Sequence, residues 1–227
     1  MLSAVAIIPS APVLVPALAG TAAAELTDLY AAVRAAGAAL PQRWIGIGTD
    51  RAELTVGPDT VGTFAGYGAD VPVAMSPRAH LATAMPLCAL VTAWLRGQVA
   101  PAAVAETRCY PASSDPGSAT SLGRALRAEI DASDEPVGVL VVADGMNTLT
   151  ASAPGGHDPD SVAGQAALDD ALAAGDTAAL AGLPDGVVGR VAFAVLAGLA
   201  GTGPAATREL YRGAPYGVGY FVGVWQP

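Results

Sequence analysis

The chain of 227 residues carries 20 acidic and 11 basic side chains, all of the latter arginine, and has a net charge of −9. Hydrophobic residues make up 52% of it, which excludes intrinsic disorder because ample apolar surface is present to offset chain entropy. An acidic chain without a basic cluster repels phosphate backbones, so we expect no nucleic-acid partner. No internal repeat, charge block or Ser/Gly linker divides the sequence, and residues 1–227 are predicted to form a single domain.

Hydrophobic periodicity predicts strands and helices that alternate along the first half of the chain. Residues 4–8 form a continuous apolar run, typical of a buried strand, and residues 21–39 have helical spacing. A second apolar strand is predicted at 44–48, a Gly-rich hairpin or excursion at 54–67, and a helix at 80–95. This order favours a layered α/β architecture.

The second half of the chain continues the alternation and ends in a hairpin pattern. The predicted elements are a strand at 105–110, a helix at 119–131, a strand at 137–143, a helix from Asp160 or Ser161 to Gly175, a short helix capped by Asp176, a helix at 189–199, and a terminal hairpin built from 209–211 and 218–225. We therefore predict an α/β fold with a central, mostly parallel or mixed sheet, helices on both faces and a C-terminal β-hairpin.

The apolar segment Leu2–Leu18 is not predicted to cross a membrane. Pro9, Pro12 and Pro16 interrupt it, and proline removes a donor and clashes in a helix interior. The segment also lacks a basic region before its apolar stretch, which a secretory signal requires. We expect a cytoplasmic protein with no membrane association.

Motifs for common cofactors and nucleophiles are missing from the sequence. No GxGxxG follows a predicted strand, and neither a Walker loop nor a GxSxG elbow is present. His80 and His157 lie too far apart in sequence to share a helical face as metal ligands. Cys88 and Cys109 have no metal-ligand spacing and are too few for a disulfide framework, so we interpret both as buried thiols.

Polar residues follow three of the predicted strands. Ser10 comes after the first strand, Asp50 after the second, and Asp144 with Asn147 after the strand at 137–143. In open α/β sheets, ligands bind beyond the carboxyl ends of the strands, so these residues predict a cleft for a small molecule. His157, in the loop that follows, is a further candidate, although solvent exposure is the commoner fate of such a loop residue. Asp and Asn side chains also commonly form hydrogen bonds with backbone groups in turns, so a purely structural role is the alternative interpretation of Asp144 and Asn147.

Four stretches resemble one known family in the same order along the chain. The opening AVAIIPSAPVLVP, residues 4–16, resembles the start of the LigB-like family, which includes the catalytic subunits of class III extradiol ring-cleavage dioxygenases. Residues 144–149 and the following APGGHDP are similar to the family's Gly-Asp-Leu-Ser-His-Arg-Leu and Ala-Gly-Tyr-Asp-Pro segments. The helix with Leu168 and Asp169 and the tail at 213–225 match the later segments, and the similarity is weakest over 53–114.

This resemblance implies a ferrous site that the chain does not reproduce. The family holds the ion with two histidines and a glutamate, and a further histidine acts as base on the catecholate. Carried over, the two metal histidines fall on Ser10 and on Asp50 or Arg51, the base falls on Asn147, and the glutamate falls near Val187. A serine hydroxyl is a poor iron ligand and valine coordinates nothing, so we predict no metal and no cofactor. Asp144 is retained, and in the family it orients the loop.

We therefore predict a LigB-like protein without ferrous iron or ring-cleavage activity that binds a small molecule or serves as a scaffold. Three alternatives stay open. One is an active dioxygenase or metal enzyme with relocated ligands, His80, His157 and a carboxylate. Another is a Mg²⁺ enzyme that uses Asp50 and Asp144, and the third is a hydrolase that uses Ser10. The sparsely charged surface is also consistent with a homodimer.

Overall fold

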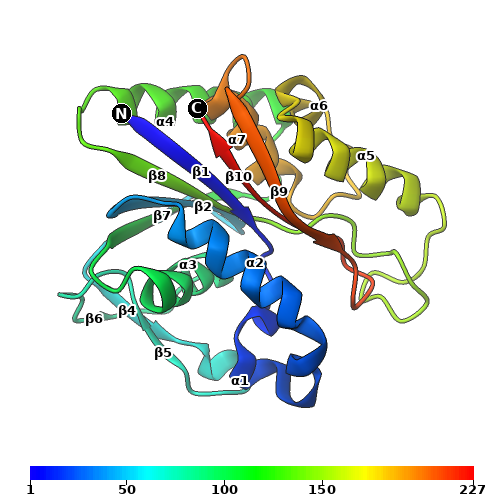
Figure 1. Ribbon diagram of the computed structural model, residues 1–227, viewed down its shortest axis with the longest axis horizontal. Helices are drawn as coiled ribbons and strands as arrows, with labels where there is room; N and C mark the ends of the chain where they lie inside the picture. Colours follow the sequence, from blue (N-terminus) through cyan, green and yellow to red (C-terminus); the bar gives the residue numbers. More distant parts are fainter.

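A computed structural model describes the backbone of residues 1–227 and every side chain except that of Ala22. Its central sheet is built from β1 (Leu2–Ile8), β2 (Arg43–Asp50), β3 (Leu54–Val56), β7 (Val104–Pro111), β8 (Val137–Val142), β9 (Ala206–Gly213) and β10 (Tyr220–Gln226). These 7 strands lie in the order β3-β7-β2-β8-β1-β10-β9 (Figure 1). The four central strands β7, β2, β8 and β1 are parallel, and the three outer strands run antiparallel to their neighbours. The predicted mixed sheet and C-terminal hairpin are confirmed.

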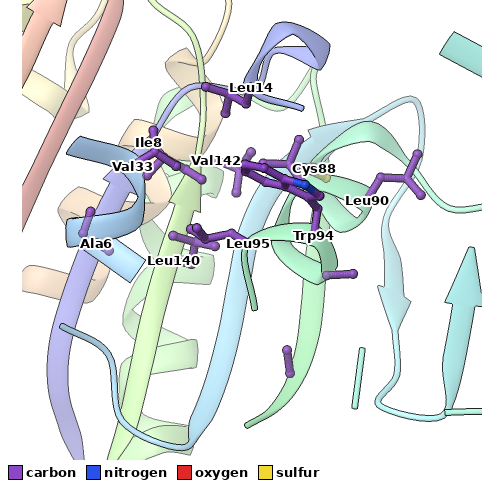
Figure 2. Packing of buried hydrophobic residues seen from close by; sticks show 14 of the residues in the cluster. Ala6, Ile8, Leu14, Val33, Cys88, Leu90, Trp94, Leu95, Leu140 and Val142 are labelled. Atoms are coloured by element: carbon purple, nitrogen blue, oxygen red, sulfur yellow. The ribbon is translucent and has the colours of Figure 1, made fainter. Parts of the chain in front are cut away.

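Helices cover both faces of this sheet, as predicted (Figure 1). One face carries α2 (Thr27–Ala38) and α3 (Leu87–Val99), and the other carries α4 (Pro116–Asp131), α5 (Ser161–Ala174), α6 (Thr177–Ala181) and α7 (Arg190–Ala200). Alternate residues of β1 enter the two cores, because successive side chains of a strand point to opposite faces. Ala6 and Ile8 pack with α2 and α3 (Figure 2), whereas Val5 and Ile7 pack with α7. A strand buried on both faces needs the continuous apolar run seen in the sequence.

The region predicted as a hairpin or an excursion at 54–67 divides between two sheets. β3 joins the edge of the central sheet beside β7, whereas β4 (Thr60–Thr63) belongs to a separate 3-stranded sheet with β5 (Pro72–Ala74) and β6 (Leu81–Ala82). The short helix η3 (Phe64–Tyr67) follows β4. The hairpin alternative was wrong, because β3 and β4 do not pair with each other: β3 pairs with the distant β7, and β4 pairs with β5 and β6.

Two predicted helices begin later than their apolar spacing indicates. Residues 12–26 instead form the short turns η1 (Pro12–Leu14), α1 (Pro16–Ala19) and η2 (Gly20–Leu26), after which α2 begins at Thr27. The helix predicted from His80 begins at Leu87, because Pro86 occupies its N-cap in an extended conformation. His80 therefore precedes β6 and is not at a helix start. Among the described residues, no helix combines the length and the hydrophobicity needed to cross a membrane.

Candidate functional site

The carboxyl ends of the parallel strands bring Ser10 and Asp144 together. Ile8 of β1 is the register partner of Val142 of β8, so the residues that follow these strands leave the sheet side by side. The Ser10 backbone N–H donates a hydrogen bond of 2.8 Å to Asp144 Oδ1. Asp50, at the end of β2, lies at the same edge on the other side of β8. The sequence-based expectation that these strand ends meet is confirmed for the Ser10–Asp144 pair.

The Asp144 carboxyl group has an acidity suited to proton exchange near neutral pH. Desolvation by burial raises its pKa to about 6, and the hydrogen bond from Ser10 opposes that rise in part. Burial also raises the pKa of the Tyr220 hydroxyl, with a further contribution from the nearby Asp144. Asp144 and Tyr220 are therefore neighbouring groups that can both donate a hydrogen bond.

The segment after β8 is held by the turn of the C-terminal hairpin. Gly145 N–H donates to Gly219 O at 2.9 Å, and Gly219 N–H donates to Met146 O at 2.7 Å. Leu149 N–H donates to Gly217 O at 3.1 Å. These bonds place the hairpin turn directly beside the loop that carries Asp144, although the two segments are far apart in sequence.

On its opposite side, the segment after β8 forms backbone hydrogen bonds with the residues that precede α7. Met146 forms an isolated β-bridge with Val187, and Gly189 N–H donates to Asp144 O at 2.8 Å. Val187 is buried, with 1% of its surface exposed. The position where the resemblance implies a glutamate thus lies beside the loop but presents only an apolar side chain. The backbone carbonyl of Asn147 accepts a hydrogen bond of 2.9 Å from Gly155 N–H, so the main chain of Asn147 stabilises the turn in this loop.

A buried polar pair on α5, which sequence reasoning missed, supports this loop. Gln165 Oε1 accepts the Met146 N–H at 2.8 Å, and Gln165 Nε2 donates to Asp169 Oδ1 at 2.8 Å. Both side chains are 7% exposed, and desolvation raises the pKa of Asp169 to about 6. Their spacing of four residues, on the face that also carries Leu168 and Leu172, was the available signal.

Replacement of Gln165 by alanine is expected to lower the free energy of unfolding by about 1–3 kcal/mol, because it leaves two buried polar groups without partners. Urea denaturation at pH 7 measures this change. The matched control is Gln42→Ala, since the Gln42 side chain is exposed and its replacement should change stability by less than about 0.5 kcal/mol. Equal stability of the two variants would contradict the supporting role of Gln165.

A buried tyrosine hydroxyl lies in the hairpin turn beside the Asp144 loop, again without a prediction from the sequence. Tyr216, in the hairpin turn, has a buried Oη that finds no hydrogen-bond partner among the described residues. Burial, and in second place proximity to Tyr216, raises the pKa of Tyr30, whose Oη donates to Val13 O at 2.8 Å. Tyr216 also contributes to the raised pKa of Tyr220. The unpaired Tyr216 hydroxyl is therefore close to both Tyr30 and Tyr220.

The two histidines are not part of this cluster. His80, before β6, is exposed, and its Nδ1 lies 3.1 Å from Arg78 O. His157 is exposed on the loop before α5, and this loop lies at the other end of the molecule from β6 (Figure 1). Within the described part of the chain, no three His, Cys, Asp or Glu side chains are grouped so that they could hold a metal ion. The relocated iron site with His80 and His157 is therefore not assembled, and neither histidine joins Ser10 in a hydrolase arrangement.

The residues at the positions implied for ferrous iron do not fit that ion. Ser10 offers a neutral hydroxyl, Val187 offers no donor, and the remaining position, Asp50 or Arg51, supplies at most one carboxylate. A facial triad requires two imidazoles and a carboxylate with open positions.

A cavity of about 500 Å³ lies at the opposite edge of the sheet, lined in part by Leu2, Arg124 and Trp225, and it includes none of the candidate residues.

Comparison with known proteins yields a likeness in fold. No protein-family model matches the chain, and no curated protein matches it. It is similar to a solved structure described as the crystal structure of uncharacterized protein JW3007 from Escherichia coli K12, with a TM-score of 0.60 and 11% sequence identity. The match covers 99% of this chain and 100% of that chain. At this identity the likeness shows that both chains share one α/β fold and carries no information on activity.

Proposed function

We propose that this chain is a LigB-like domain that binds a small hydroxylated aromatic molecule at the carboxyl edge of its sheet without ferrous iron. The order of the LigB-like motifs along the chain supports the family assignment. The replacement of the implied iron ligands by Ser10, Asp50 and Val187 supports the loss of ring cleavage, since these side chains do not form a tight ferrous site.

The observation that carries the proposal is the unpaired hydroxyl of Tyr216. Its Oη is buried in the turn that covers the Asp144 loop. A buried hydroxyl without a partner costs about 1–3 kcal/mol, and a ligand hydroxyl that donates to it or accepts from it would remove that cost. We expect a second hydroxyl of the same molecule to bind at Asp144 and Tyr220, whose neighbours Gly145 and Gly219 are joined by a backbone hydrogen bond.

Two binding measurements test the proposal, one with ferrous iron and one with catechol. Untagged protein is incubated anaerobically with ferrous iron, desalted and analysed for metal, while catechol binding is followed by ligand-observed NMR. We expect less than stoichiometric iron and saturable catechol binding without iron. Stoichiometric iron together with catechol-dependent oxygen uptake would overturn the proposal in favour of an active dioxygenase.

Removal of the Tyr216 hydroxyl separates ligand binding from stability. Tyr216→Phe should raise the free energy of unfolding of the free protein by about 1 kcal/mol, because an unpaired buried polar group is lost. The same change should weaken catechol binding by about 3- to 10-fold, the value of one hydrogen bond. The control is Tyr110→Phe, which lies in the core on the other face of the sheet. Unchanged catechol affinity in Tyr216→Phe would exclude this hydroxyl from the site.

Three sequence-based expectations stay predictions. They are the homodimer, the absence of a nucleic-acid partner and the cytoplasmic location. Sedimentation of the purified protein tests the first of these directly.

A further inference from the structure

Two buried thiols meet beneath the Asp50 end of the candidate site. Cys88 in α3 and Cys109 in β7 have Sγ atoms 3.5 Å apart, and the two residues are 1% and 0% exposed. A disulfide bond is about 2.05 Å long, so the sulfur atoms are in contact and need to approach by only about 1.5 Å to bond. Both cysteines are free in the structure.

The close approach of these thiols depends on a glycine in the strand between them. Gly48 of β2 is the register partner of Cys109. A Cβ atom on Gly48 would lie 2.3 Å from the Cβ of Cys88, so only glycine lets the first turn of α3 pack this closely on the sheet. Figure 2 shows Cys88 within the core between α3 and the sheet.

The two thiols form a hydrogen bond in which either sulfur can be the donor. The hydrogen bond between them raises the pKa of Cys88 and lowers the pKa of Cys109. The thiol that loses its proton becomes the nucleophilic thiolate, and its partner keeps the proton. The contact from Cys88 Sγ to Thr49 O is 3.9 Å long, so no strong bond holds this thiol away from its partner.

Asp50 and Tyr67 are polar residues in the neighbourhood of the buried pair. Asp50 is only partly buried, and its charge acts on both thiols. Tyr67, which is 45% exposed, has a pKa raised by burial and then by the proximity of Cys88 and Asp50.

We propose that Cys88 and Cys109 are a redox-responsive dithiol that forms an intramolecular disulfide when the protein meets a peroxide. One of the two thiols takes one oxygen atom from hydrogen peroxide to become a sulfenic acid, and one water is released. The sulfur of the other cysteine then attacks the sulfenic sulfur, the S–S bond forms, and a second water leaves. The two thiols lose two hydrogen atoms in total, and the peroxide is reduced to two waters. The link joins the first turn of α3 to β7 and does not depend on a ligand in the candidate site.

The test treats the reduced, full-length chain with a small excess of hydrogen peroxide and then alkylates free thiols in denaturant. Trypsin cleaves only after arginine here, so Cys88 and Cys109 fall on separate peptides, 79–96 and 109–124. We expect these peptides to appear as one disulfide-linked species, about 2 Da lighter than the two reduced peptides together. The oxidised chain should also melt several degrees higher, because the link restricts the unfolded chain.

A cysteine variant is the control for this experiment. Cys88→Ala should yield no linked peptide and should leave Cys109 alkylated or oxidised to an acid. If peroxide leaves both wild-type thiols open to alkylation, or converts Cys109 to sulfinic acid without a link, the proposal is wrong. A disulfide between two chains in place of the intramolecular link would overturn it as well. The peptide measurement on the wild-type chain decides the matter even where a cysteine variant fails to fold.

Discussion

Replacement of Gly198 by alanine lowers the free energy of unfolding by about 1–3 kcal/mol, in spite of the higher helix propensity of alanine. Gly198 lies where α7 crosses α4, and a Cβ atom there would be 2.0 Å from the backbone oxygen of Thr120. Across the crossing, a Cβ atom on Gly123 would be 2.0 Å from the backbone oxygen of Val195. Because both obstacles are backbone atoms, no side-chain rotation relieves the clash and the helices must move apart.

Gly97→Ala is the matched control for this prediction. Gly97 is also helical, lies near the end of α3 and is exposed, and a Cβ atom added there would meet nothing within 4 Å. Alanine there should leave stability unchanged or raise it by up to about 1 kcal/mol. Urea denaturation of both variants measures the contrast. If Gly198→Ala proved as stable as Gly97→Ala, the close α4–α7 contact would not exist in solution.

The fold was predictable from the sequence where the structure of an element depends on the local pattern of its own residues. The strand at 137–143 is a continuous apolar run, so burial on both faces of a sheet is its only outcome. The start of α3 was not predicted correctly, because apolar spacing continues across Pro86 although a proline cannot continue a helix interior. The pairing of β3 with β7 was missed, since pairing between distant segments leaves no local signal.

In the candidate site too, residues placed by neighbouring strand ends were predicted, whereas residues placed by contacts between distant segments were missed. Ser10 and Asp144 could be brought together from the sequence, because ends of neighbouring parallel strands meet at one edge. Tyr216 could not be added to them, since its position depends on a hairpin that folds back over the Asp144 loop. Gln165 was missed for a similar reason, as its amide is buried only when the loop after β8 packs on α5.

The carboxyl group of Asp144 should make the folded state less stable as the pH rises from about 4 to about 6. Its pKa is about 6 in the folded chain against an ordinary 3.8, so the folded state binds the proton more tightly than the unfolded state. Between these values the unfolded chain holds fewer protons, and stability falls as pH increases. Asp169, whose burial also raises its pKa to about 6, acts in the same direction.

Asp144→Asn removes this cost and should therefore stabilise the protein at pH 7.5, by up to about 3 kcal/mol. The asparagine Oδ1 can still accept the Ser10 N–H, so the link between the two strand ends is kept. The gain should shrink at pH 4.5, where the wild-type carboxyl group of the folded chain is protonated. Urea denaturation at both pH values measures the difference, with the exposed Asp134→Asn as control. A variant that is destabilised equally at both pH values would show that Asp144 is held as a carboxylate because the Ser10 bond outweighs its burial.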